Sequence, residues 1–132
     1  MKREIKFRGR VRRAEVSHGS HSDWVKGNYI LDSNDVAHIL CTHPLRGDKL
    51  FEIDPETVGQ YTGLKDKNGR EIYEGDICTH KFFGEIVVVW SEEDARFACN
   101  TLDDVIKDEL SYCLADIETV IGNIHNNPEL LK

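Results

Sequence analysis

The sequence predicts a mainly β fold (β-rich α+β) of antiparallel strands with one or two short helices. Three observations support this prediction. Apolar and charged residues alternate over residues 4–12, a hairpin signal stands at Asn68-Gly69, and short apolar segments separated by glycine-rich or acidic turns recur along the chain. With 132 residues, the chain has the length of one domain and can bury a normal core.

The first predicted strand covers residues 4–12, where the side chains alternate with the period of a half-buried strand. One side of this strand carries Ile5, Phe7, Gly9 and Val11, and the other carries Glu4, Lys6, Arg8, Arg10 and Arg12. We therefore expect the first side to face a core and the basic side to face solvent.

Two further strands are predicted over residues 24–31 and 36–42, joined by an acidic turn at 32–35. Gly27 interrupts the first of them, which indicates a bulge or a close approach of another backbone segment. Pro44 ends the second, because proline cannot donate a hydrogen bond to a strand ladder. A short strand over 50–53 and a turn or single helical turn over 54–57 follow.

The densest turn chemistry lies between residues 58 and 77. Asn68-Gly69 predicts a hairpin with a two-residue type I′ turn, because both central positions need positive φ. Glu74-Gly75-Asp76 predicts a second tight turn. We interpret Asp66 and Asp76 as turn residues rather than catalytic carboxylates.

After these turns, residues 86–90 are apolar on both faces and are predicted to be the most buried strand. Strands over 95–99, 112–114 and 118–124, a helix over about 102–110 and a helical turn over 127–131 complete the chain. The run from Gly75-Asp76-Ile77 to Gly84 and the following apolar strand resembles the opening strands of small SH3-like barrels. We therefore expect one domain over residues 1–132, with an antiparallel region over about 1–57 and a hairpin plus barrel-like region over about 58–132.

The formal charge of −7 at pH 7 is unevenly distributed. Residues 1–13 hold seven of the 17 basic side chains and one acid, whereas the other 119 residues hold 10 bases and 23 acids. The body of the protein is therefore strongly acidic and its first strand strongly basic.

The composition also bears on cellular location. The chain has no apolar run of membrane-spanning length and begins with charged residues, so we expect neither an anchor nor a signal peptide, and a location in the cytoplasm of a host cell. The four cysteines Cys41, Cys78, Cys99 and Cys113 are widely spaced, which favours reduced thiols over a disulfide framework.

Four segments resemble the YopX family in order along nearly the whole chain. They are Arg3 to Gly9, Trp24-Val25 with Gly27, Pro55 to Ile77, and Val120 to Leu131. The resemblance implies an accessory protein encoded by a bacteriophage or prophage, and it implies no particular biochemical activity. The run 10–13, the loop with His18 and His21, and Cys78-Thr79-His80 depart from the family pattern, so a function at those positions would belong to this protein alone.

The basic side chains Lys6, Arg8, Arg10 and Arg12 are candidates for nucleic-acid binding, because alternate side chains on a strand project in a row about 6.5 to 7 Å apart and can follow phosphates. The interpretation we favour is that this row neutralises the acidic remainder or protects an edge strand. An acidic protein without a recognised nucleic-acid-binding motif repels phosphates outside the row.

Cys-Thr-His occurs twice, at 41–43 and 78–80. Cysteine and histidine two positions apart share one side of a strand, so two such pairs could supply four ligands to a tetrahedral zinc ion, with His18 and His21 as spares. Most structural zinc sites use Cys-x-x-Cys instead, so we favour buried thiols beside histidines and assign no metal.

We expect no enzymatic activity and assign no catalytic residue and no cofactor. The sequence contains no Gly-x-Ser-x-Gly, no Walker-type loop and no His-Glu-x-x-His. The glycines of residues 59–75 are explained by turns, so no phosphate-binding loop is needed to account for them.

Phe82-Phe83 lies in a predicted turn that would expose at least one aromatic ring. Exposed aromatic rings are typical of interfaces, although rings covering the open ends of a β core would give the same composition. We expect a protein-interaction module that self-associates or binds a host or phage protein, with Phe82 and Phe83 at the interface. Nucleic-acid binding is the alternative, followed by a small zinc-binding protein.

Overall fold

The structure is a computed structural model that describes residues 4–12, 24–101 and 116–131. It divides into two compact units, residues 1–61 and 62–132. The strands are antiparallel and the helical elements of the described residues are short 3-10 turns, so the predicted mainly β fold is confirmed. The predicted division near residue 57 and the SH3-like barrel portion stay predictions.

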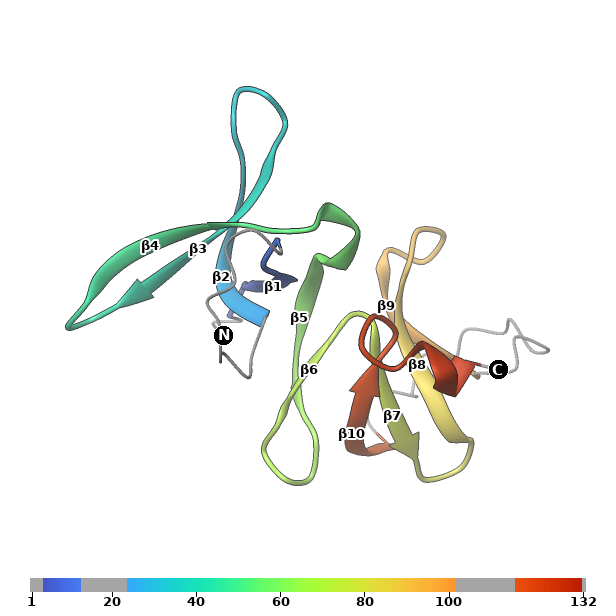
Figure 1. Ribbon diagram of the computed structural model, residues 1–132. Helices are drawn as coiled ribbons and strands as arrows, with labels where there is room; N and C mark the ends of the chain where they lie inside the picture. The colour runs from blue at the N-terminus through green and yellow to red at the C-terminus, as the bar shows by residue number, and fades with distance from the viewer. Residues whose placement is uncertain (1–3, 13–23, 102–115, 132) are drawn as a thin grey trace. The chain divides into compact units, whose positions relative to one another are not determined.

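The first unit contains β1 (Phe7–Arg10), β2 (Trp24–Leu31), β3 (Ala37–His43), β4 (Gly47–Glu52), η2 (Pro55–Thr57) and the start of β5 (Gly59–Lys65). The strand order is β4-β3-β2-β1-β5, and Figure 1 shows β3 and β4 as a long twisted hairpin. The predicted ends of β2 and β3 agree with the structure within one residue. The predicted close approach at Gly27 is confirmed, because a Cβ there would collide with the backbone oxygen of Leu40 on β3.

The core of the first unit is built on Ala37, Ile39 and Ile53. Five partly buried side chains pack against them: Phe7, Val25, Tyr29, Cys41 and Val58. The chain after β4 returns to the end of β1, where Val11 bridges to Ile53 and the Asp54 N–H donates to the Arg10 carbonyl at 2.9 Å. Gly9 belongs to this contact, because a Cβ on it would collide with the Ile53 side chain.

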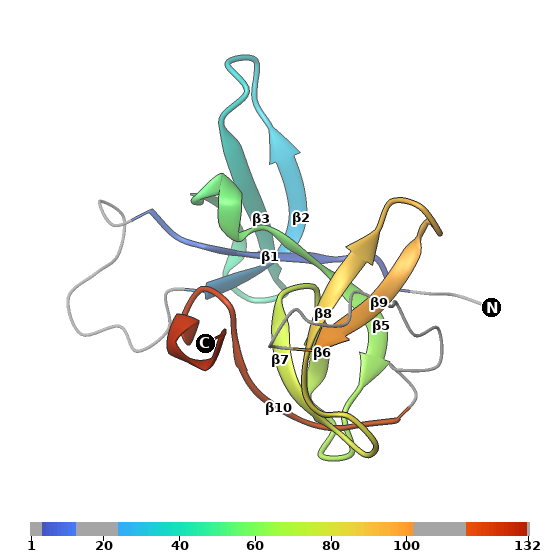
Figure 2. The same ribbon diagram turned by 90° about the vertical axis from the view of Figure 1, so that its right-hand side faces the viewer.

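The second unit contains the remainder of β5, β6 (Glu71–Tyr73), β7 (Asp76–His80), β8 (Gly84–Ser91), β9 (Arg96–Thr101), β10 (Ile117–Asn123) and η4 (Pro128–Leu131). A four-stranded sheet has the order β10-β7-β8-β9 (Figure 2). Its buried cluster is Ile72, Cys78, Ile86, Val88, Cys99, Ile117 and Val120. The predicted helix over 102–110 and strand over 112–114 lie outside the described residues.

The predicted hairpin at Asn68-Gly69 exists between β5 and β6, but the predicted type I′ turn is wrong. Only Gly69 of the two central residues has positive φ, at 83°. The Asp66 carboxylate shapes the turn instead, because its Oδ1 accepts the backbone N–H groups of Asn68 and Arg70, both at 2.9 Å. Its Oδ2 accepts the N–H of Val120 on β10 at 3.0 Å, so one side chain fixes the turn and joins it to another strand.

The second predicted turn, between β6 and β7, is confirmed. Gly75 has φ of 92°, and the buried Asp76 carboxylate accepts the Tyr73 N–H at 2.7 Å. Asp66 and Asp76 are therefore both turn residues, as predicted.

The structure corrects three other predictions. Ile5 is exposed and Arg8 is only 8% exposed, so the predicted buried and solvated sides of the first strand do not hold at these two positions. Strand β7, with four of its five residues buried, is more buried than β8, where Trp90 reaches the surface. Cys99 is disulfide-bonded, whereas Cys41 and Cys78 are free thiols as expected, and Cys113 lies outside the described residues.

Candidate functional site

The turn between β7 and β8 displays the two aromatic side chains that the sequence singles out. Phe82 is 64% exposed and Phe83 is 36% exposed. Both backbone N–H groups donate to Nδ1 of His80, at 3.0 Å for Phe82 and 3.3 Å for Phe83. The His80 ring also packs against the Phe83 ring, with 4.8 Å between the ring centroids.

The imidazole of His80 is therefore the internal support of this turn. Because Nδ1 accepts two N–H groups, the ring proton resides on Nε2, which is buried and has no partner among the described groups. The Lys81 N–H donates to the Asp116 carbonyl at 3.1 Å, and Gly84 closes the turn with φ of 73°. The turn is thus fixed by backbone hydrogen bonds while its two phenyl rings stay accessible.

The basic residues of the first strand are occupied by contacts within the first unit. Lys6 pairs with Glu4 at 3.2 Å, Arg10 with Asp54 at 3.8 Å and Arg12 with Glu52 at 2.8 Å. The Arg8 guanidinium stacks over the Trp24 ring, 5.0 Å from its centroid. The row of basic side chains is thus partly neutralised by carboxylates of its own unit.

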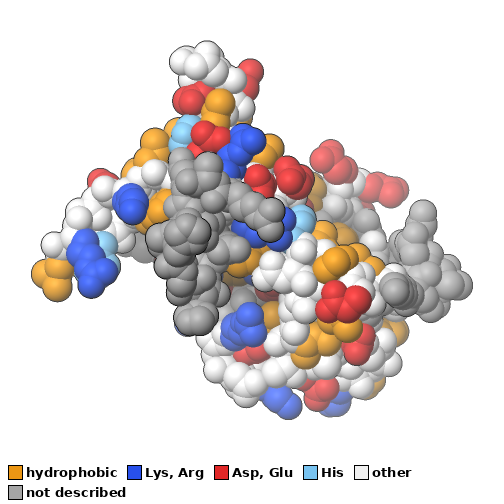
Figure 3. Space-filling view, in the orientation of Figure 1, with side chains coloured by type: hydrophobic (Ala, Val, Ile, Leu, Met, Phe, Trp, Pro, Cys, Tyr) orange, Lys and Arg blue, Asp and Glu red, His pale blue; other side chains and the backbone are white. Residues whose placement is uncertain are grey.

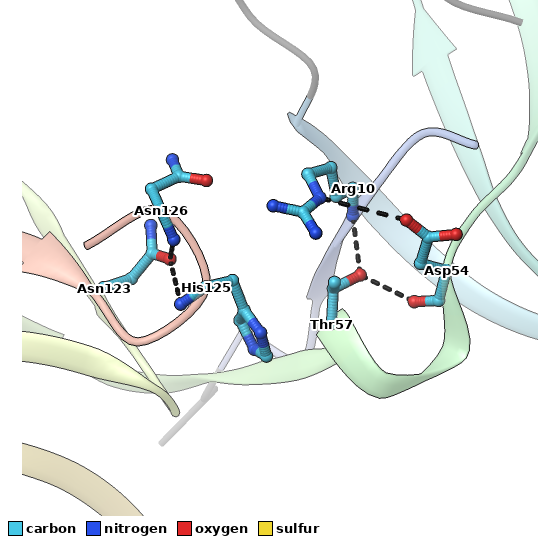
Figure 4. A network of polar contacts seen from close by, with 6 residues as sticks. All are labelled: Arg10, Asp54, Thr57, Asn123, His125 and Asn126. Carbon is cyan, nitrogen blue, oxygen red and sulfur yellow. Dashed lines mark hydrogen bonds and ion pairs between the residues drawn. The ribbon is translucent and has the colours of Figure 1, made fainter. Parts of the chain in front are cut away.

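Backbone contacts fix one of these basic residues further (Figure 4). The Arg10 N–H donates to the Thr57 hydroxyl at 2.9 Å, and that hydroxyl donates to the Asp54 carbonyl at 2.6 Å. The segment around η2 therefore holds both the backbone and the charge of Arg10. This position has a structural explanation that requires no ligand.

The two Cys-Thr-His tripeptides build the same kind of turn. In β3–β4, Nδ1 of His43 accepts the N–H groups of Leu45 and Arg46, both at 3.1 Å, just as His80 does in β7–β8. Each histidine lies opposite a glycine of positive φ, His43 opposite Gly47 and His80 opposite Gly84. The similarity therefore extends over seven residues, Cys-Thr-His-Pro-Leu-Arg-Gly at 41–47 and Cys-Thr-His-Lys-Phe-Phe-Gly at 78–84.

The tip of the β3–β4 hairpin is also apolar and cationic. Leu45 is 91% exposed, and Figure 3 shows a hydrophobic side chain at this tip, at the left of the view, beside Lys or Arg side chains.

The two tripeptides belong to different units. Zinc binding stays the less favoured alternative that the sequence leaves open, and His18 and His21 lie outside the described residues.

The comparisons with known proteins identify the family. A family model described as YopX protein matches residues 6–132, nearly the whole chain. The chain belongs to the YopX family. No curated protein shows significant similarity to it.

A solved structure supports the fold of this YopX chain. Protein EF1440 from Enterococcus faecalis aligns with a TM-score of 0.54 and 24% sequence identity, covering 99% of this chain and 100% of that chain. At this identity the similarity concerns the fold alone. None of the helices in the described part of the chain has the length and apolar character needed to cross a membrane.

The C-terminal part of the YopX pattern has a structural explanation. The carboxamide oxygen of Asn123 accepts the N–H groups of His125 at 3.0 Å and Asn126 at 2.9 Å (Figure 4). The Asn127 carboxamide oxygen accepts the Asn123 N–H at 3.2 Å, and a Cβ on Gly122 would collide with the Asn127 side chain. Gly122, Asn123 and Asn127 therefore shape the turn after β10.

Sequence reasoning missed the support that His80 gives to the aromatic turn. The signal was present, because the tripeptide repeats with a glycine four residues after each histidine. The tripeptides were interpreted only as a ligand set for a metal and, preferably, as buried thiols beside histidines. Side chains of Ser, Thr, Asn and Asp commonly accept nearby backbone N–H groups in turns, and the imidazoles of His43 and His80 do the same here.

Proposed function

We propose that this YopX protein is a non-enzymatic protein-interaction module that self-associates through the β7–β8 turn. The observation that carries the proposal is Phe82, a large aromatic side chain that is mostly exposed on a turn fixed from within by His80. Exposed aromatic side chains of this kind are common anchors of protein interfaces. A fixed turn loses little conformational freedom on binding, so more of the contact energy becomes affinity.

The family resemblance supports a proposal for the setting of this activity. We propose an accessory role for a bacteriophage or prophage, carried out in the cytoplasm of the host cell. Turn formation explains Asp66 and Asp76, so these carboxylates need no catalytic role.

Nucleic-acid binding through Lys6, Arg8, Arg10 and Arg12 is the alternative. It is weakened by the carboxylates that pair with three of these side chains and by the burial of Arg8. Binding through phosphate contacts would fall steeply with salt, whereas an apolar interface between proteins would not. We therefore expect no DNA or RNA binding at physiological salt in a gel-shift assay.

The test of self-association is the molar mass in solution, measured by size-exclusion chromatography with light scattering over a range of concentrations. The wild-type protein is expected to exceed the 15.1 kDa of one chain. Phe82→Ser removes the aromatic anchor and is expected to weaken association by about 2 kcal/mol or more, roughly 30-fold in the dissociation constant.

Ile121→Ser provides a matched control, because Ile121 is another exposed apolar side chain of the second unit, on β10. It is expected to leave association unchanged. A wild-type protein that stays at 15.1 kDa at the highest concentration would refute self-association. Equal effects of the two substitutions would refute the assignment of the interface to the β7–β8 turn.

A further inference from the structure

The hairpin between β8 and β9 carries an exposed aromatic pair. Trp90 and Phe97 lie directly opposite each other on the two strands, with 5.1 Å between ring centroids in an edge-to-face arrangement. Trp90 is 41% exposed and Phe97 is half-buried. This end of the hairpin therefore offers an apolar surface that its own strands do not cover.

Carboxylates follow this aromatic pair in the connecting turn. Glu92 and Glu93 are exposed, and neither forms an ion pair with any part of the chain that the structure describes. Asp94 differs, because Arg96 neutralises it at 3.1 Å. The aromatic surface is thus bordered by two negative charges that no cationic side chain of the described residues neutralises.

The β7–β8 turn has the complementary character. Phe82 provides the apolar side chain, and the Lys81 ammonium lies over its ring, 5.4 Å from the centroid. Within the described residues, no carboxylate pairs with Lys81. An apolar group beside a single positive charge therefore matches an apolar surface beside negative charges.

These two surfaces cannot meet within one chain. The β7–β8 turn enters β8 at Gly84, whereas Trp90 lies at the other end of the same strand. Six residues of extended strand separate them by about 20 Å. A contact between Phe82 and a Trp90–Phe97 surface would therefore need two molecules.

We propose that the β7–β8 turn of one copy of this protein binds the β8–β9 end of a second copy. Phe82 packs on Trp90 and Phe97, and Lys81 pairs with Glu92 or Glu93 of that second copy. This inference deepens the proposed self-association and rests on it. The β7–β8 turn and the Trp90–Phe97 surface lie at opposite ends of β8. Two copies in antiparallel arrangement would therefore make the contact twice and form a two-fold dimer. Copies in head-to-tail arrangement would make it once with each neighbour and form a ring.

Charge reversal tests the pairing by sedimentation velocity over a concentration series. Lys81→Glu alone, and Glu92→Lys with Glu93→Lys, are each expected to weaken association at least tenfold, because like charges then face each other. The three substitutions together are expected to restore the dissociation constant to within about threefold of wild type, since the pair is re-formed with reversed signs. Lys67→Glu, at an exposed position of the β5–β6 turn, serves as the charge-matched control and is expected to have no effect.

The outcomes separate this inference from the proposed function. Recovery in the combined variant supports the pairing. Loss of association in Phe82→Ser with unchanged association in the Glu92→Lys and Glu93→Lys variant overturns the inference and leaves the β7–β8 interface standing. Wild-type affinity in Phe82→Ser overturns both. Every altered side chain is exposed, so we expect the variants to unfold at the same temperature as wild type. This measurement shows whether their fold is intact.

Discussion

Replacing Asp66 by alanine is expected to destabilise the second unit more than any other single change in the β5–β6 turn. The carboxylate is almost fully buried, with the residue 6% exposed, and it accepts three backbone N–H groups. One of these donors, the Val120 N–H, is itself buried and lies 54 residues along the chain. The substitution would leave this donor without an acceptor.

The size of the effect follows from these contacts. A buried N–H without an acceptor costs about 1–3 kcal/mol. Loss of the two turn hydrogen bonds resembles the loss of a helix cap, about 0.5–2 kcal/mol. Together they predict a loss of roughly 2–4 kcal/mol, or about 7–14 °C in the midpoint of thermal unfolding for a chain of this size.

The effect is also expected to depend on pH in a defined direction. Desolvation raises the pKa of Asp66, but the hydrogen bonds from Val120, Arg70 and Asn68 and the charge of Arg70 outweigh it, so the pKa is lowered from its ordinary value of 3.8. A lowered pKa means that the stabilisation is fully present above the unfolded-state value and is lost as the pH falls through the folded-state value. The difference between wild type and Asp66→Ala should therefore be constant near neutral pH and shrink below about pH 4.

Urea unfolding followed by tryptophan fluorescence at pH 7, 5 and 3 measures this difference. Asp32→Ala is the control, because Asp32 also accepts two backbone N–H groups, from Asn34 and Val36, but is exposed to water. Asp32→Ala should lower the free energy of unfolding by less than Asp66→Ala, because water can hydrogen-bond the two N–H groups in place of the carboxylate. A free energy of unfolding for Asp66→Ala close to that of wild type at pH 7, or a difference that persists unchanged at pH 3, would refute the reasoning.

Three further predictions concern other parts of the chain. His80→Ala should speed amide hydrogen exchange in the β7–β8 turn and weaken self-association, whereas His80→Asn, which retains a side-chain acceptor, should preserve both more closely. Gly27→Ala should lower the free energy of unfolding by about 1–3 kcal/mol or more, because its Cβ meets the Leu40 carbonyl oxygen, and a melting temperature equal to wild type would contradict this contact. In the native protein Cys41 should react with a thiol reagent, but slowly at pH 7, because burial raises its pKa. Cys78 is fully buried and should react only after the protein unfolds. Mass spectrometry locates the modified cysteine, and modification of native Cys78 would contradict its burial.

Residue patterns were sufficient to predict most strands and turns. The alternation of β2 and β3, Gly75 in the β6–β7 turn and the turn role of Asp66 depend on local backbone chemistry, which is visible in sequence. The type I′ prediction failed because the Asp66 carboxylate selects a different turn, and this side-chain effect competes with the Asn-Gly preference.

Features that depend on tertiary contacts could not be predicted in the same way. The burial of Arg8 results from its stacking on Trp24, and alternation along β1 contains no information about that partner. At the candidate site, exposure of Phe82 and Phe83 follows from their place in a turn. The support that His80 gives to this turn could be identified only from the structure. The sequence shows the position of the histidine but not which N–H groups donate hydrogen bonds to its ring.

The most direct test of the central claim is nuclear magnetic resonance of the isotope-labelled protein over a range of concentrations. We predict that the backbone resonances of residues 79–84 and the indole resonance of Trp90 shift or broaden with concentration, while those of the β5–β6 turn at 66–70 stay unchanged. Spectra that do not change with concentration, or changes confined to other parts of the chain, would contradict an interface at the β7–β8 turn.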